Sequence, residues 1–581
     1  MAEVREGLPV AILPAVPESA ASRRGFVAAA VGLFALLAQL PILNRGAVPL
    51  DEGQLLAIAE RILAGEVLYR DVYTGIFPGI YYLTAMLLDL LGEDVLVTRW
   101  AAAVVNAAIA AGLWLVGAGA MRPGWALLAP ALYVALVPFA YPALTMFNYS
   151  PLALVFAIWA LFFLLRYLET ARLADAAIAG LLLGACGLVK QNFGAFASLA
   201  LALGYLWGRR GAAPVARRSA LGGLLPIVAC ALLPALLAAL GLAAAGAFGA
   251  FLQDTLLGIG DSQLEAFNDP IPPIFGPHPQ DDGRFVFAYT PSSLYAYLVL
   301  GEELFGLEMS PGIRSTAIRL AYGGALATLL GGLWLLVADR CPLPKRRRAA
   351  GCVVCFAGLL FLGIFPSAIW SHLAYVLAPL LLLFALLAER SAAWLSRFGQ
   401  TTERCFAGAL GVLCVGALAV GAQVSLDLRR WYPEPLGLER GSLYVSHDQR
   451  ALLAGAARFL ASCSQPGQPV FVAPDMPLVY FLAERRNPTP YDLVIPGAID
   501  EALIVRRLDD SGTECIVYNP KMYLQFAAFD ELFSEVAAHL TSEYRRETVI
   551  QGESTAWWGL VRQRTRQSPV PRTPAPRTRG S

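Results

Sequence analysis

The stretch SALGGLLPIVACALLPALLAALGLAAAG, residues 219–246, runs without a single charged side chain. About 20 apolar residues are enough for a helix to cross the ~30 Å hydrocarbon core of a bilayer, so this stretch predicts a transmembrane helix. The whole chain has the same character, because 57% of its residues are hydrophobic and only 15% are charged. Soluble domains carry about 25% charged residues. The sequence therefore predicts an integral membrane protein, and its formal net charge of +1 gives no indication of a nucleic-acid partner.

Further apolar runs of similar length lie on both sides of this stretch. Together they predict about eleven spans: 25–43, 99–120, 125–140, 150–168, 173–189, 193–208, 219–246, 316–338, 349–366, 372–389 and 405–426. The first run follows Arg23 and Arg24 but is not followed by a convincing small-residue cleavage site, so we interpret it as an uncleaved helix. The chain is expected to be a polytopic α-helical membrane protein.

The basic residues between the spans predict the orientation, because cytoplasmic loops hold an excess of Lys and Arg. Every second connection is basic: Arg23 and Arg24; Arg122; Arg166 and Arg172; Arg209, Arg210, Arg217 and Arg218; Arg340, Lys345, Arg346, Arg347 and Arg348; Arg390, Arg397 and Arg404. The intervening connections 141–149 and 366–371 contain no Lys or Arg, and 190–192 contains only Lys190. We therefore expect a cytoplasmic N-terminus, residues 1–24, and a C-terminus outside.

The segment IFPGIYYLTAMLLDLLG, residues 76–92, is apolar enough to raise the question of another span. A crossing here would invert all later loops and place the basic ones outside. We therefore interpret it as re-entrant or lying along the outer interface, a depth that suits Tyr81 and Tyr82. Residues 44–98 then form a first external loop and residues 247–315 a second, within a membrane domain covering 25–426.

The composition changes after residue 426. Ser446 and Gln449 fit a capping box ahead of a helix. Residues 469–474 and 514–519 are typical of buried strands, and 499–510 and 528–540 of helices. We expect a small extracytoplasmic α/β domain over 427–565, followed by a disordered Pro- and Arg-rich tail, 566–581. Outside the cell Cys463 and Cys515 are free to form a disulfide, but the sequence does not show whether they meet.

Two adjacent carboxylates, Asp51 and Glu52, begin the first external loop. They stand at the start of an amphipathic helical pattern, EGQLLAIAERILAG, residues 52–65. Acidic side chains stabilise a helix N-terminus, so capping alone is one explanation of the pair. A role in chemistry at the outer membrane surface is the other.

The loop as a whole resembles the GT-C superfamily of membrane glycosyltransferases, especially bacterial relatives of protein O-mannosyltransferases and lipid A aminoarabinose transferases. An apolar first helix precedes the Asp-Glu pair, and a later Arg99 precedes the second span. The intervening pattern consists of Ala59, Arg61, Leu63 and Gly65, then Tyr69-Arg70-Asp71, then Pro78, Gly79 and Tyr81. The order of many spans followed by a soluble external domain extends the resemblance over nearly the whole chain.

The resemblance implies transfer of a sugar from a polyprenyl-phosphate donor to an acceptor on the outer face of a bacterial cytoplasmic (inner) membrane. Asp51 matches the general base, which takes the proton of the attacking hydroxyl as the anomeric carbon inverts. Glu52 is expected to orient the acceptor or to raise the pKa of Asp51. Lys190, Arg70 and His372 are candidates to bind the donor phosphate. Asp71, Tyr81 and Arg99 are further loop candidates.

The sequence carries no recognisable metal motif. The acids Asp261, Asp269, Asp281 and Asp282 of the second loop lack metal spacing, and Cys352 and Cys355 lack the partners of a zinc site. We therefore expect no required metal and identify no other cofactor. The acids of the second loop leave binding of a divalent cation as an open alternative.

Other functions remain open at this stage. A multi-span transporter would place charges near mid-membrane. A cell-surface polysaccharide polymerase or ligase would share the donor chemistry but is expected to use arginines of a late loop, where Arg284 stands. A non-catalytic scaffold would use its terminal domain to bind a partner. The donor sugar, the lipid carrier and the glycan, lipid or protein nature of the acceptor are not encoded in any pattern we find.

Overall fold

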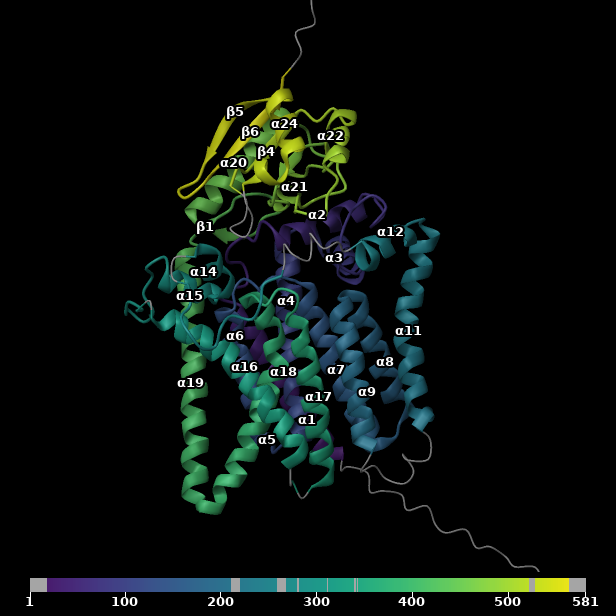
Figure 1. The fold of residues 1–581 in the computed structure, drawn as a ribbon, viewed down its shortest axis with the longest axis vertical. Helices are drawn as coiled ribbons and strands as arrows, with labels where there is room; N and C mark the ends of the chain where they lie inside the picture. The colour runs from purple at the N-terminus through teal and green to yellow at the C-terminus, as the bar shows by residue number, and fades with distance from the viewer. Residues whose placement is uncertain are drawn as a thin grey trace, which may run out of the picture.

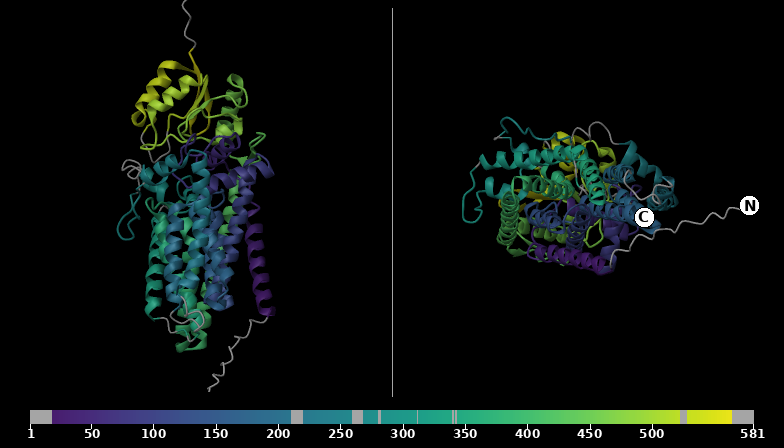
Figure 2. Two further views of the ribbon diagram at one scale, coloured as in Figure 1. Left: turned by 90° about the vertical axis from the view of Figure 1, so that its right-hand side faces the viewer. Right: turned by 90° about the horizontal axis from the view of Figure 1, so that it is seen from below.

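The computed structural model describes residues 18–209, 220–258, 268–279, 282–310, 312–338, 341, 343–521 and 528–563. A bundle of long helices makes up most of the molecule, and a small domain with a β-sheet covers one end of it (Figures 1 and 2). The protein is therefore the predicted polytopic helical membrane protein with a C-terminal α/β domain. The predicted disordered tail, 566–581, lies outside the described residues.

Each of the eleven predicted spans coincides with a helix or a pair of short helices. These are α1 (Glu18–Gln39), α4 (Val95–Ala120), α5 (Pro123–Ala126) with α6 (Leu128–Phe139), α7 (Tyr149–Thr170), α8 (Leu173–Val189), α9 (Gln191–Arg209), α11 (Ala220–Ala244), α16 (Gly312–Ala338), α17 (Pro344–Phe361), α18 (Trp370–Leu395) and α19 (Gln400–Trp431). In the described part of the chain, seven helices are long and apolar enough to cross a membrane by length and composition, and several shorter apolar helices accompany them.

Helices α11 and α19 stand at opposite edges of the bundle (Figure 1). The α11 side chains Leu225, Leu232 and Leu236 are more exposed than buried, which is the arrangement expected of a helix that faces lipid. Its inner side packs closely on α8 because glycines leave room. A Cβ at Gly180 would lie 2.3 Å from the Ile227 carbonyl oxygen, and one at Gly184 would lie 2.5 Å from that of Ala231.

The segment 76–92 forms the short helix α3 (Gly79–Leu91), which lies at the head of the bundle beneath the C-terminal domain (Figure 1). Tyr82, Met86 and Leu90 are exposed on one side, whereas Tyr81 and Leu88 are buried on the other. This stripe fits a helix lying along the outer interface, as the basic loops predict.

The C-terminal domain contains a four-stranded sheet in the order β3-β4-β6-β5. The predicted strands are present as β3 (Phe471–Ala473) and β4 (Cys515–Tyr518), which pair in parallel. Helices α22 (Glu501–Asp510), α23 (Phe529–Leu532) and α24 (Ser534–Glu543) match the predicted helical segments. The antiparallel strands β5 (Tyr544–Gln551) and β6 (Ala556–Arg562) were not predicted; charged residues interrupt the apolar pattern of β5, and β6 is a short apolar run close to the polar tail. Helix α20 (His447–Cys463) ends in a disulfide from Cys463 to Cys515, with 6.3 Å between the Cα atoms.

The C-terminal domain holds the helix α2 (Asp51–Leu63) of the first external loop in place. Gly53 lies so close to α21 (Leu478–Ala483) that a Cβ would be 2.2 Å from the Leu478 nitrogen, which itself donates to the Pro49 carbonyl at 3.1 Å. Ser446 accepts from the Gln449 N–H at 3.2 Å as an N-cap. The Gln449 side chain does not complete the predicted capping box and instead bonds both backbone groups of Ala47, at 3.2 and 2.9 Å.

Candidate functional site

Asp51 is the first residue of α2, and its carboxylate is accessible from outside the protein. No hydrogen bond or ion pair to another described residue engages this carboxylate. Leu50 is the N-cap and makes no side-chain cap, so Asp51 supports the helix only through its charge. Protein atoms nevertheless surround the group on most sides, and this loss of water raises the pKa of Asp51 to about 6. An accessible, unpaired carboxylate of this kind is able to accept a proton near neutral pH.

Glu52 points into a different environment, one that the sequence did not predict. Its side chain is 1% exposed, and both its oxygens pair with the guanidinium of Arg99, Nη2 to Oε2 at 2.8 Å. Arg99 is completely buried at the start of α4 and also donates to the Gly46 carbonyl at 3.0 Å. The pair joins the first external loop to α4, and it leaves Glu52 no free oxygen for the predicted contact with an acceptor.

Lys190 lies in the turn between α8 and α9 and is 8% exposed. Its ammonium donates to the Ser150 hydroxyl at 2.7 Å. The rings of Tyr149 and Phe193 lie 4.9 and 4.6 Å from Nζ, within the range of cation–π attraction. Burial lowers the pKa of Lys190 to about 7, and no carboxylate of the described residues forms an ion pair with it. Within the described part of the chain, this amino group is therefore held by a hydroxyl and two rings and by no carboxylate.

Tyr149 connects these two groups. Its ring lies against Lys190, and burial raises the pKa of its hydroxyl, a rise to which the nearby Asp51 charge adds. Tyr81 of α3 also belongs to this cluster: it is buried, burial raises its pKa, and the Asp51 charge adds to that rise. The Tyr81 hydroxyl lies 2.7 Å from Thr74 Oγ1. Sequence reasoning missed Tyr149, whose only signal was an aromatic residue beside the loop that precedes a span.

His372 lies near enough to Lys190 to interact with it electrostatically. Its Nδ1 is 2.5 Å from the Ser367 carbonyl oxygen, so Nδ1 carries the proton and donates it to that oxygen. In the neutral ring, Nε2 is then the nitrogen without a proton. The Ser367 hydroxyl donates to Asp269 at 2.7 Å, and Arg284 pairs with the same carboxylate at 3.3 Å. Asp269 and Arg284 of the second external loop therefore fix the turn that carries His372.

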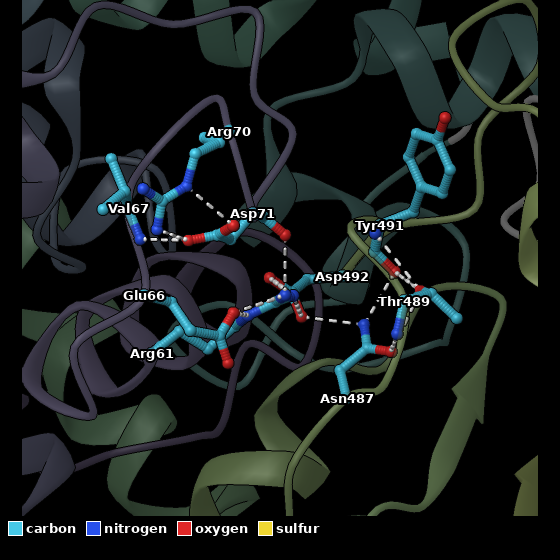
Figure 3. Close-up of polar contacts among 9 residues, drawn as sticks. All are labelled: Arg61, Glu66, Val67, Arg70, Asp71, Asn487, Thr489, Tyr491 and Asp492. Carbon is cyan, nitrogen blue, oxygen red and sulfur yellow. Dashed lines mark hydrogen bonds and ion pairs between the residues drawn. The ribbon is translucent and has the colours of Figure 1, made fainter. Parts of the chain in front are cut away.

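Arg70 does not join this cluster through any contact of the described residues. It is half exposed and forms an ion pair with Asp71 at 2.7 Å (Figure 3). Asp71 also accepts from the Val67 N–H at 2.8 Å, and the Arg70 guanidinium lowers the pKa of that carboxyl. Arg70 is therefore held by its neighbour Asp71 in the structure.

The described residues give no structural indication of a metal centre, because no three of their His, Cys, Asp or Glu side chains come close enough to hold a metal ion. Of the four acids singled out in the second loop, Asp261 and Asp281 lie outside the described residues. Asp269 is in the network with Ser367, and Asp282 caps α14 (Gly283–Tyr289) by accepting from the Phe285 N–H at 3.1 Å.

The fold is similar to that of several solved structures. ArnT from Cupriavidus metallidurans in the apo state superposes with a TM-score of 0.51 at 16% identity, over 93% of this chain and 98% of that one. The oligosaccharyltransferase of Archaeoglobus fulgidus, tethered to an acceptor peptide, gives a TM-score of 0.49 at 12% identity, over 93% and 74%. No family model and no curated protein sequence matches the chain. The likeness to ArnT shows that the two chains share a fold.

Proposed function

We propose that the protein transfers a sugar from a polyprenyl-phosphate donor to an acceptor on the outer face of the cytoplasmic membrane, with Asp51 as general base. The observation that carries the proposal is that two unusual groups lie near Tyr149: an exposed residue, Asp51, whose carboxylate has no partner among the described residues, and a buried ammonium, Lys190, that has no carboxylate partner among them. The carboxylate can take the proton of the attacking hydroxyl, and the ammonium can stabilise the leaving phosphate. The resemblance of the first external loop to GT-C enzymes and the shared fold support this assignment.

The chemistry requires one displacement. An acceptor hydroxyl attacks the anomeric carbon and gives its proton to Asp51, while the bond from that carbon to the phosphate oxygen breaks and the phosphate leaves with the electron pair. With a pKa of about 6, Asp51 is ionised in about ten of eleven molecules at pH 7, yet it remains a stronger base than an ordinary aspartate. A single displacement inverts the anomeric carbon.

Lys190 stabilises the departing phosphate in this proposal. Arrival of an anion favours the ammonium form, so donor binding raises the pKa of Lys190 again and completes the missing ion pair. The rings of Tyr149 and Phe193 hold the ammonium in place before the donor arrives. His372, kept in position by Ser367 and Asp269, is the second candidate to contact the phosphate.

Glu52 and Arg70 take different parts from those first expected. Glu52, with Arg99, anchors the loop that carries Asp51, and Arg70 pairs with Asp71, which also holds the turn at Val67. Both are positioning roles. No metal enters the proposed step, and the acceptor is assigned only as a hydroxyl-bearing glycan, lipid or protein.

The topology is part of the proposal, because a polyprenyl-linked sugar reaches Asp51 only if the first external loop faces outward. The N-terminus is then cytoplasmic and the C-terminal domain lies outside. The Cys463–Cys515 disulfide supports this orientation, since disulfides persist in oxidising compartments.

The test compares envelope glycolipids and glycoproteins, by mass spectrometry, between a deletion strain and the same strain rescued with wild type or Asp51→Asn. Loss of a general base reduces the rate by about 10²- to 10⁴-fold, so the variant should fail to restore the missing glycan. Asp89→Asn, which neutralises an exposed acid on α3, serves as the matched control and should restore it. A normal glycan profile in the Asp51→Asn strain would refute the proposal.

A further inference from the structure

A cavity of about 200 Å³ lies between helix α2 and the C-terminal domain. Ala57, Glu60, Arg61 and Ala64 of α2 line one side of it, and Arg440, Tyr480 and residues 484–487 line the other. Glu60 follows Asp51 by nine residues, which is about 2.5 helical turns and about 14 Å along the axis. The cavity therefore faces the opposite side of α2 from Asp51 and is a separate place on the molecule.

Interactions within the protein hold the walls of the cavity in position. Arg61 pairs with Glu66 at 2.7 Å and with Asp492 at 3.1 Å, and Asn487 donates to Asp492 at 2.9 Å (Figure 3). Arg440 donates to Glu60 at 2.6 Å from the domain side. Side chains fixed in this way lose little freedom when a ligand arrives, which favours binding.

The wall groups keep unused hydrogen-bonding capacity. Glu60 engages Arg440 through Oε1, and Glu66 engages Arg61 through Oε2, so the second oxygen of each has no partner among the described residues. The exposed side chain of Arg486 likewise makes no hydrogen bond or ion pair with another described residue. Acceptors and a donor therefore surround a space of limited size.

The charges of the lining indicate the class of ligand. Four arginines, Arg61, Arg440, Arg485 and Arg486, stand among four acids, Glu60, Glu66, Glu484 and Asp492. An ion of either sign would meet as many like charges as opposite ones. A neutral compound with several hydroxyl groups matches such a lining, because each hydroxyl both donates and accepts. The volume of about 200 Å³ lies below the ~300–1,000 Å³ of pockets for drug-sized ligands and suits one sugar ring.

We propose that this cavity binds one neutral sugar ring of a glycan, at a site distinct from the Asp51 cluster. This inference rests on the proposed function in one respect: the glycan would be the acceptor or the product of the proposed transfer. Domain interfaces are common places for such pockets. A glycan bound in this cavity contacts α2, the helix that begins at Asp51. Binding here would therefore keep the reacting end of the glycan near the membrane surface.

The experiment uses the full-length protein in nanodiscs and saturation-transfer NMR with methyl glycosides of glucose, galactose, mannose, arabinose and N-acetylglucosamine, with inorganic phosphate as the anion arm. At least one glycoside should bind, and Ala64→Trp, which narrows the cavity, should weaken that binding at least tenfold. Leu63→Trp, at a neighbouring exposed position that does not line the cavity, should leave it unchanged. Glu66→Ala provides a second variant that weakens binding without filling space.

Three results would overturn the inference: no binding of any glycoside, binding that neither Ala64→Trp nor Glu66→Ala weakens, or binding of phosphate alone. Asp51→Asn separates the two proposals. It should retain glycoside binding while transfer is lost, whereas retained transfer in that variant would refute the proposed function and leave the cavity to be judged by its own binding data.

Discussion

At the scale of single residues, the protein separates two neighbouring carboxylates by environment. Asp51 is accessible and unpaired, whereas Glu52 is buried against Arg99. Adjacent residues of a helix point about 100° apart, so one enters solvent and the other the protein. The sequence presents them as a pair, and only their surroundings give them different chemistry.

The raised pKa of Asp51 predicts a pH-dependent reactivity. Carbodiimides modify protonated carboxyl groups, so labelling of Asp51, followed by peptide mass spectrometry, should be half-maximal at about pH 6 and fall as the pH rises above it. Asp71, whose pKa is lowered by Arg70, is the internal control and should stay unlabelled over the same range. Labelling of the two residues in parallel would contradict the environment assigned to Asp51.

Tyr149 offers a second test because its ring makes the contact with Lys190, whereas its hydroxyl is not part of that contact. Tyr149→Phe keeps the ring beside Lys190, so binding of undecaprenyl phosphate, followed by native mass spectrometry, should be unchanged while transfer falls. Tyr149→Leu removes a cation–π contact of about 1–2 kcal/mol and should weaken that binding by about 5- to 30-fold. Tyr82→Leu, on the exposed side of α3, is the control for loss of a tyrosine. Equal effects of the Phe and Leu variants on binding would refute this division.

At the scale of elements, buried ion pairs attach the external helix α2 to its neighbours. Glu52 joins it to Arg99 of α4, and Arg61 joins it to Asp492 of the C-terminal domain. Gly53 allows α2 to approach α21 closely, because any side chain there would collide with Leu478. The position of Asp51 is thus set by both the membrane helices and the soluble domain.

Removing one partner of a buried pair leaves an uncompensated charge, which costs about 3–5 kcal/mol. Glu52→Leu should therefore lower the melting temperature of the purified protein strongly. The double variant Glu52→Leu/Arg99→Met removes both charges and should recover much of the loss. If Glu52→Leu melted like wild type but abolished transfer, Glu52 would belong to the chemistry instead of the scaffold.

At the scale of the whole molecule, the orientation in the membrane is open to direct measurement. In a Cys405→Ser background, Glu303→Cys tests the second external loop and Gln400→Cys tests the start of α19, on the side opposite in the predicted topology; both positions are exposed. An impermeant thiol reagent added to spheroplasts should label the first and spare the second until the membrane is broken. The reverse pattern would place Asp51 in the cytosol and remove its access to the donor.

The sequence by itself determined the membrane character, the positions of the helices and two strands of the terminal domain, whereas the interfacial placement of 76–92 and the role of Asp51 stay predictions. Length, polarity and basic loops are local properties, and physical rules act on them directly. Contacts between residues far apart in the chain were decided only by the tertiary structure. Glu52 with Arg99, Tyr149 between Asp51 and Lys190, the Cys463–Cys515 bond and the cavity beneath the C-terminal domain all depend on packing, because burial and partner choice are set where distant segments meet.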